Sequence, residues 1–449
     1  MYWRITVAIL VVYLLYLPFS GYTQLYHDSL GYWFSSIFFH KQGSVALLNY
    51  NESLRGYLYP LTLFPWRVAQ FYTNLPQLLF TRTLGALVAA AMFGWLGPTL
   101  WETIVQPGRP LSWPRCVLFA ALGFLFWRDY FNFPLTDFPA FGALALAVGL
   151  AYRPKSWLHV AGAGVCAAAA ANFRPVYLVA LPPVAVLVAV APVVGGWQRV
   201  ARVGALLVGM AVVMLPQLAI NLRHFNEASP LVLAKNKDID NLYLMQLHEG
   251  LQHQKYETNI GPDYPSQRMF FPNAHGAMLL QSLPGDTISS YEQYVRELLL
   301  KRPVDMARVY LLHLFNGLDI QYSTPYIPKV YTTTWGLAWV NYSVWFGALL
   351  LAVRSWRRLT WHKVLVLGAL LIPCAAVLPV CMECRFLVPM HLLMCAVVCF
   401  GWPAAWRPSA IPWPTLVLVG VAYVGFVVLC FLTSAQAQAT LQQGGRLLW

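Results

Sequence analysis

The sequence predicts an all-α polytopic membrane protein, and two observations carry that prediction. Only 10% of the 449 residues are charged, whereas 59% are apolar. Apolar runs of about 17 to 22 residues recur from one end of the chain to the other, and this is the length that a helix needs to cross a bilayer. Together they exclude an ordinary water-soluble globular protein.

Eleven apolar runs, separated by Pro, Gly and charged residues, are expected to be transmembrane helices. The first is followed by Gln24, His27 and Asp28 and not by a small-residue cleavage site, so we expect it to be a retained span. The predicted spans are residues 5–20, 76–97, 114–128, 138–152, 157–173, 176–194, 203–221, 334–353, 364–380, 386–402 and 412–432.

Basic residues divide unevenly between alternate connections. With the N-terminus inside, the inner segments hold twelve Lys or Arg and one acid, Glu102, while the outer segments hold 18 basic and 16 acidic residues. This is the asymmetry expected of cytoplasmic loops. The net charge of +13 therefore follows from topology and requires no nucleic-acid partner. Nearly all the acids lie on the outer side, so we expect any chemistry there.

The chain divides into three predicted parts: an N-terminal transmembrane module (1–221), a long outer segment (222–333) and a C-terminal transmembrane module with a short tail (334–449). The first outer connection, residues 21–75, is rich in aromatic residues and prolines and predicts short interfacial helices. In the long segment, Ser289 or Ser290 is expected to cap a helix that breaks at Pro303 and then resumes.

Two acids stand at the outer ends of predicted spans. Asp28, in "YHDSLGYW", lies about eight residues beyond the first span, where it could accept a proton, bind a cation or pair with an arginine. Asp137, in "FNFPLTDFPAF", lies beside hydrocarbon, where a charge is costly, so it is a functional candidate; pairing with Arg128 is the alternative. His27 is a candidate to orient Asp28 or contact an acceptor.

Arginines recur at the same predicted depth. Because a guanidinium is always charged and suits phosphate, several of them together indicate a site for an anionic group at the membrane face. Lysines in "KNKDIDN" could add phosphate contacts. The candidates are Arg55, Arg82, Arg174, Arg385, Lys235 and Lys237.

The order of these short patterns resembles the GT-C superfamily of membrane glycosyltransferases, which includes aminoarabinose transferases of lipid A and protein mannosyltransferases. Asp28 matches the catalytic acid by position, and "LRGYLYPLTLFPW" with "LPQLLFTRTLGAL" resembles the loop before the second span. "LTDFPAFGALALAV" resembles the second acidic position, "NFRPVYLVALPP" a basic-plus-proline step, and "ECRFLVPMHLL" an E-x-R-[aromatic]-x-x-P pattern, with Glu383 as a supporting residue.

The resemblance implies a GT-C-type helical bundle that moves a sugar from a polyprenyl-phosphate donor with inversion. Asp28 would act as base, and Asp137 would be the second catalytic acid. It implies a glycan, lipid A, lipopolysaccharide or protein acceptor, and a bacterial inner membrane with the site facing the periplasm. The first outer segment has no obvious DxD, which leaves open whether Mg²⁺ or Mn²⁺ takes part.

Two other classes fit parts of the pattern. A transporter or flippase also contains intramembrane charges, but it would place them near the midplane within repeated halves, and the sequence shows no repeat. An enzyme similar to O-antigen ligase would use arginine and histidine of the large outer segment and a polyprenyl-diphosphate donor, and not an acid after the first span.

Overall fold

The computed structural model describes residues 1–41, 44–191, 196–402 and 412–443. The chain is 72% helix and 4% strand, consistent with an all-α membrane protein. Within the described residues, five helical stretches are long and apolar enough to cross a membrane: Tyr2–Phe19, Gln77–Ile104, Gly196–Phe225, Trp335–Ser355 and Trp413–Ala439. Shorter apolar helices cover Asp137–Tyr152, Trp157–Phe173, Pro175–Val190, Trp361–Val377 and Cys384–Phe400. Eleven spans remains a prediction, and residues 192–194 of one predicted span lie outside the described residues.

The surface of the last long helix supports membrane association. Helix α18 (Trp413–Ala439) has the highest mean hydropathy of the five candidates, yet only 11% of that stretch is buried within the protein. Leu418, Val421 and Leu429 are each more than 60% exposed. An apolar helix with so much exposed aliphatic surface is stable in lipid and not in water.

The chain folds as two compact units that interleave along the sequence. Unit 1 contains residues 1–113, 129–242 and 359–376; unit 2 contains residues 114–128, 243–358 and 377–449. Unit 1 thus holds residues of the predicted N-terminal module without 114–128, the first part (222–242) of the predicted outer segment, and one helix of the predicted C-terminal module. Such exchange cannot be predicted from hydropathy, which reports where helices lie along the chain and not which helices pack together.

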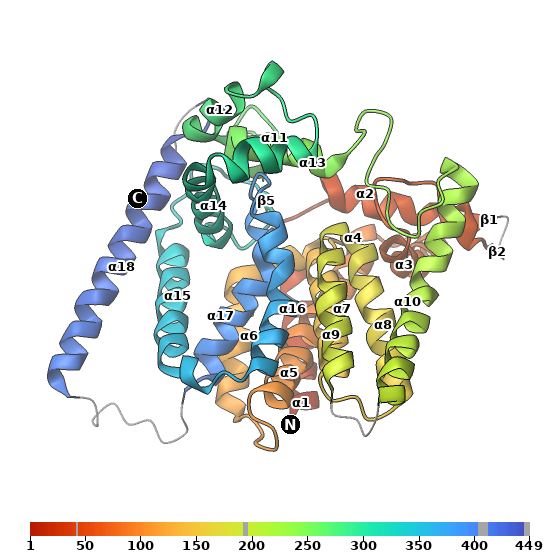
Figure 1. Ribbon diagram of the computed structural model, residues 1–449, viewed down its shortest axis with the longest axis horizontal. Coiled ribbons are helices and arrows are strands. Elements are labelled where there is room, and N and C mark those ends of the chain that lie inside the picture. The colour runs from red at the N-terminus through yellow and green to blue at the C-terminus, as the bar shows by residue number, and fades with distance from the viewer. Residues whose placement is uncertain (42–43, 192–195, 403–411, 444–449) are drawn as a thin grey trace. The chain divides into compact units, whose positions relative to one another are not determined.

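Unit 1 is built from helices that pack side by side, with α2 (His27–Ser35) and α3 (Leu58–Thr73) at one end of them (Figure 1). Helices α8 and α10 approach backbone to backbone, because a Cβ on Gly209 would lie 1.9 Å from the carbonyl oxygen of Ala161. The elements are α1 (Tyr2–Tyr16), α2 (His27–Ser35), the antiparallel pair β1 (His40–Lys41) and β2 (Ser44–Val45), α3 (Leu58–Thr73), α4 (Gln77–Ala90), α5 (Gly97–Ile104), α7 (Asp137–Tyr152), α8 (Trp157–Phe173), α9 (Leu181–Val190), α10 (Gly196–Phe225) and α16 (Trp361–Val377).

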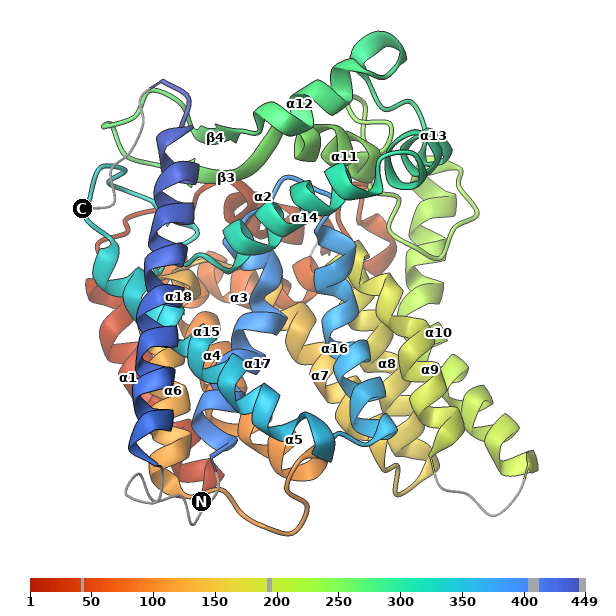
Figure 2. The ribbon, with the colours of Figure 1, turned by 60° about the vertical axis from the view of Figure 1, so that its left-hand side comes forward.

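Unit 2 combines long apolar helices with a mixed region at one end, where strands lie beside α11 and α12 (Figure 2). Its helices are α6 (Trp113–Trp127), α11 (Leu242–Gln252), α12 (Ala274–Gln281), α13 (Tyr291–Gln293), α14 (Pro303–Leu318), α15 (Trp335–Ser355), α17 (Val388–Phe400) and α18. The predicted helix break is confirmed: the Ser290 side chain accepts from the Gln293 amide, and α14 begins at Pro303.

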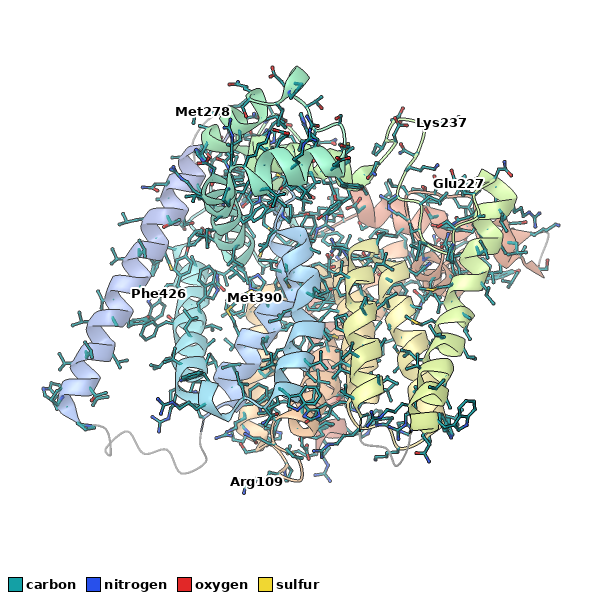
Figure 3. All side chains as sticks on the ribbon, viewed as in Figure 1. Arg109, Glu227, Lys237, Met278, Met390 and Phe426 are labelled. Carbon is teal, nitrogen blue, oxygen red and sulfur yellow. The ribbon has the colours of Figure 1, made fainter. Side chains whose placement is uncertain are left out.

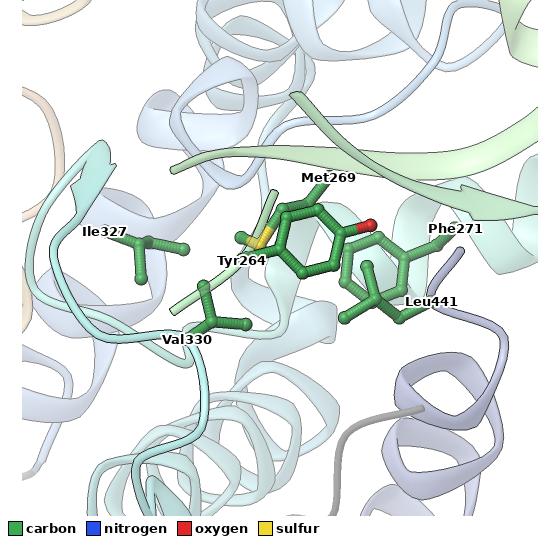
Figure 4. Packing of buried hydrophobic residues seen from close by; sticks show 6 residues of the cluster. All are labelled: Tyr264, Met269, Phe271, Ile327, Val330 and Leu441. Atoms are coloured by element: carbon green, nitrogen blue, oxygen red, sulfur yellow. The ribbon is translucent and has the colours of Figure 1, made fainter. Parts of the chain in front are cut away.

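A three-stranded sheet in unit 2 was not predicted from the sequence. Strand β3 (His253–Asn259) pairs antiparallel with β4 (Arg268–Pro272) and parallel with β5 (Tyr326–Ile327). Behind it lies an apolar cluster, shown in Figure 4, that holds the strands against the end of α18: Tyr264, Met269, Phe271, Ile327, Val330 and Leu441. Polar residues dominate "HQKYETN", so its alternation is too weak to be read as a strand.

Candidate functional site

Asp28 lies in the first turn of α2, a short helix within the segment 21–75 where short interfacial helices are expected. The Ser29 hydroxyl bonds back to Tyr26, accepting from its amide at 3.0 Å and donating to its carbonyl at 2.6 Å, so the helix begins at His27. A carboxylate in the first turn is favoured by the helix dipole. Asp28 Oδ1 accepts a hydrogen bond from Arg55 Nη2 at 3.0 Å, and its side chain is 45% exposed.

The residue before this acid has an unusual backbone. His27 has φ = 43°, in the left-handed region that non-glycine residues rarely adopt. Such a conformation costs on the order of 1–3 kcal/mol and is found more often at functional sites. His27 lies where the chain enters α2, one residue before Asp28. Whether the His27 imidazole orients Asp28 remains a prediction.

Arg55 is held by α2 from two sides. Its guanidinium lies over the Tyr32 ring, 5.0 Å from the ring centroid, and a Cβ on Gly31 would lie 3.2 Å from its Nη1. Burial alone would lower the pKa of Arg55, but Tyr32, Asp28 and Glu52 outweigh that effect and raise the pKa above its ordinary value. Arg55 is therefore a fixed positive charge beside the Asp28 carboxylate.

The segment that carries Arg55 is also fixed to the end of α8. The Leu58 amide donates to Asn172 Oδ1 at 2.9 Å, and Asn172 Nδ2 donates to Gln217 Oε1 at 2.9 Å. Gly56 fits against the same residue so closely that a Cβ there would lie 2.1 Å from the Asn172 carbonyl oxygen. Only glycine allows that approach. Because Arg174 follows Asn172 by two residues, the Arg55 and Arg174 segments meet here.

Asp137 forms an ion pair with Arg174 at the start of α7. Its side chain is 2% exposed, and the Tyr130 hydroxyl donates to Oδ2. The Tyr32 hydroxyl lies 3.4 Å from Thr136 Oγ1, at hydrogen-bonding distance from the residue before Asp137. Tyr32 thus contacts Arg55 with its ring and the Asp137 segment with its hydroxyl.

Arg82, on α4, contacts the segments that precede Asp28 and Asp137. Its Nε donates to Asn132 Oδ1 at 2.8 Å, and its Nη2 donates to the Tyr22 carbonyl at 2.7 Å. Within the described residues these acceptors are neutral, so the Arg82 charge is not matched by a carboxylate. The ring of Phe133 contacts both Tyr22 and Tyr26, immediately before α2. We call Asp28, Arg55, Arg82, Asp137 and Arg174 the acid–arginine cluster.

The predicted lysines lie after α10. The Ser53 hydroxyl donates to the Lys235 carbonyl at 2.6 Å, which places that backbone near the Arg55 segment, but the Lys235 amine pairs with Glu227 at 2.5 Å. Lys237 is exposed on the same loop, and Figure 3 shows it and Glu227 beyond the end of α10. Lys235 is thus compensated by an acid and Lys237 lies on an exposed loop, so Arg82 is the better candidate to bind a phosphate.

Glu383 and Arg385 belong to unit 2. Arg385 Nε donates to Glu383 Oε2 at 2.7 Å, and both side chains are at most 10% exposed. The two charges compensate each other. Both residues line a pocket of unit 2 that the sequence did not predict.

The described residues do not fit a dedicated Mg²⁺ or Mn²⁺ site. They contain no group of three His, Cys, Asp or Glu side chains arranged to hold a metal ion. At Asp28, the Arg55 guanidinium already occupies one carboxylate oxygen and would repel a cation.

Sequence reasoning missed the neutral residues that build the cluster. Asn132 and Asn172 lie within the motifs "FNFPLTDFPAF" and "NFRPVY", directly beside apolar residues, and a buried amide there was the available signal. Tyr32 gave no signal, since one more tyrosine in an aromatic-rich segment is unremarkable in composition.

Searches with family models, curated proteins and solved structures found no match to this chain.

Proposed function

We propose that this chain is a membrane glycosyltransferase that moves a single sugar from a polyprenyl-phosphate donor to a cell-envelope acceptor. The observation that carries the proposal is Asp28: a carboxylate that is 45% exposed, on a helix start, beside an arginine. A base for a sugar hydroxyl needs an ionised, accessible oxygen, and the Asp28–Arg55 pair provides one.

The proposed reaction is a direct displacement. The acceptor hydroxyl oxygen attacks the anomeric carbon and its proton passes to an Asp28 carboxylate oxygen. The bond between the anomeric carbon and the phosphate oxygen breaks, and its electron pair leaves with the polyprenyl phosphate. The configuration at the anomeric carbon is inverted. General-base catalysis of this kind typically contributes about 10²- to 10⁴-fold.

The arginines have separate roles in this proposal. Arg82, whose described partners are neutral, is the main contact for the phosphate, whose negative charge grows as the bond breaks. Arg55 and Arg174 add positive charge but are partly compensated by their acids. Asp137 is buried and engaged by Arg174 and Tyr130, so we assign it a positioning role and not contact with substrate.

The finer assignments follow from the GT-C resemblance. They are a hexose or a pentose such as arabinose as the sugar, and a glycan, lipid A or a protein as the acceptor. The reaction takes place at the periplasmic face of a bacterial inner membrane. The proposal rests on unit 1 residues alone, because Arg385 and Glu383 neutralise each other in unit 2.

The test uses the full chain reconstituted in lipid vesicles with polyprenyl-phosphate sugars radiolabelled in the sugar. Transfer of label to an added glycan, to lipid A or to water supports the proposal. Label that crosses the bilayer while still attached to the lipid identifies a flippase and overturns it. Activity with polyprenyl-diphosphate donors alone favours a ligase.

A further inference from the structure

A pocket in unit 2 has a lining unlike that of the acid–arginine cluster. It opens to solvent, and its cavity volume is about 40 Å³. Its walls come from α6, β3, the end of α14, the chain from there to β5, and the segment before α17. Polar and aromatic side chains dominate: Trp127, Tyr256, Glu257, Asn316, Asp319 and Tyr322.

The charges of this pocket do not favour an anion. Lys255 Nζ pairs with Glu257 Oε1 at 2.9 Å, and Arg385 pairs with Glu383. Each cation is therefore compensated by a neighbouring carboxylate. A third carboxylate, Asp319, is 3% exposed, which leaves the lining with two cations and three acids. A phosphate would meet net negative charge here.

Asp319 is fixed by its own donors. Its Oδ1 accepts from Gln321 Nε2 at 2.6 Å and from the Tyr342 hydroxyl at 2.8 Å, and its Oδ2 accepts from the Ser434 hydroxyl at 2.5 Å. A buried carboxylate that accepts from three donors is held in one position. It gives the pocket a fixed wall of polar groups.

One acceptor in this wall lacks a donor. Asn316 is 2% exposed, and its Nδ2 donates to Gln254 Oε1 at 3.1 Å, but its Oδ1 has no hydrogen-bond partner among the described residues. A buried acceptor left unsatisfied is costly, and native structures contain few of them. A hydroxyl donor from a ligand would satisfy it.

Aromatic residues form part of the apolar lining of the pocket. Trp127, Tyr256 and Tyr322 offer flat apolar faces beside these polar groups. Sites that combine a few fixed polar groups with aromatic walls select small molecules by their hydroxyl pattern. A sugar ring has hydroxyls for the carboxylates and amides, and C–H faces for the aromatic rings.

We propose that this pocket binds one uncharged sugar ring, with Asn316 Oδ1 accepting a hydrogen bond from a ring hydroxyl. The proposal goes beyond the transferase function and requires no donor, so either one can fail without the other. It also changes the expectation for Arg385 from a phosphate contact to part of a neutral sugar site.

Saturation-transfer NMR with the full chain in detergent tests the proposal. The probes are methyl α-D-mannopyranoside, methyl α-D-glucopyranoside and methyl β-L-arabinopyranoside, compared with glucose 1-phosphate. We expect at least one methyl glycoside to bind more tightly than glucose 1-phosphate. Asn316→Leu, similar in size but without the acceptor, should weaken that glycoside by about three- to tenfold, the effect of one hydrogen bond.

Gln281→Leu, at an exposed position of α12, is the matched control and should bind as the wild type does. If Asn316→Leu does not fold, Trp127→Leu removes an aromatic wall and should weaken the same glycoside. Absence of methyl glycoside binding to the wild type overturns the proposal. So does tighter binding of glucose 1-phosphate, or equal affinity in the wild type and in the folded variant.

Discussion

Gly56→Ala tests whether the Arg55 segment is fixed to α8 as described. A Cβ at this position would lie 2.1 Å from the Asn172 carbonyl oxygen and 2.4 Å from its Oδ1. These distances are too short for any contact, and the nearest atom is backbone at the end of α8. The segment must therefore move away from Asn172 and lose the hydrogen bond from the Leu58 amide.

The two costs give the expected magnitude. Overpacking of this kind costs about 1–3 kcal/mol, and the lost hydrogen bond adds roughly 0.5–1.5 kcal/mol. We thus expect Gly56→Ala to destabilise unit 1 by about 1.5–4.5 kcal/mol and to lower the melting temperature by several degrees. Sugar transfer should fall as well, since Arg55 moves with the segment and no longer faces Asp28.

Gly204→Ala is the matched control, because no atom lies within 4 Å of a Cβ placed there, in the same unit on α10. In a helix interior it should be neutral or stabilise by about 0.5–1 kcal/mol. The assay is thermal unfolding of the detergent-purified variants, followed by circular dichroism. If Gly56→Ala melts at the same temperature as the wild type, the described packing of Gly56 on Asn172 is wrong.

Three further predictions concern single side chains. Asp137→Asn breaks a buried ion pair and should cost about 3–5 kcal/mol in thermal unfolding, whereas Asp28→Asn should cost less than about 1 kcal/mol because its pair is half exposed; equal effects would contradict the distinction. Arg82→Gln should raise KM for the lipid-linked donor by about 10- to 100-fold, the value of a charged hydrogen bond, and an unchanged KM would exclude Arg82 from phosphate binding. His313, in α14 outside the predicted spans, is buried and donates from Nδ1 to the Leu378 carbonyl at 2.6 Å, and burial lowers its pKa. The unfolded chain therefore binds a proton at His313 more readily than the folded chain does. The stability contributed by the neutral, buried imidazole is fully present above about pH 6.5 and is lost as pH falls below it. Thermal unfolding of His313→Asn should show a weaker loss of stability than the wild type between about pH 7 and pH 5.

The sequence was most informative where local physics decides the structure. Hydropathy located the apolar helices, and the helix break was predicted from Ser290 and Pro303, because capping and proline act within a few residues. The start of α2 was missed, since a back-bonded serine and a left-handed histidine leave no periodic signal.

The candidate site was predicted less completely. The sequence indicated that acids and arginines share one depth, but it could not show which would pair. Asp137 forms its ion pair with Arg174, 37 positions away in the numbering, whereas the nearer Arg128 was the suggested partner. The choice depends on how α7 and α8 pack, and on neutral contacts such as Asn172 with Gly56.

The central claim is that Asp28 acts as the base in sugar transfer. The rate of sugar transfer by the Asp28→Asn variant tests this claim most directly. Single-turnover transfer from a radiolabelled polyprenyl-phosphate sugar would be compared in the wild type, Asp28→Asn and Glu227→Gln. Glu227 is the matched acid, since it is 42% exposed and paired with a cation as Asp28 is. We predict that Asp28→Asn stays folded and loses about 10²- to 10⁴-fold in rate, while Glu227→Gln keeps wild-type activity. Transfer by Asp28→Asn at the wild-type rate would contradict the account.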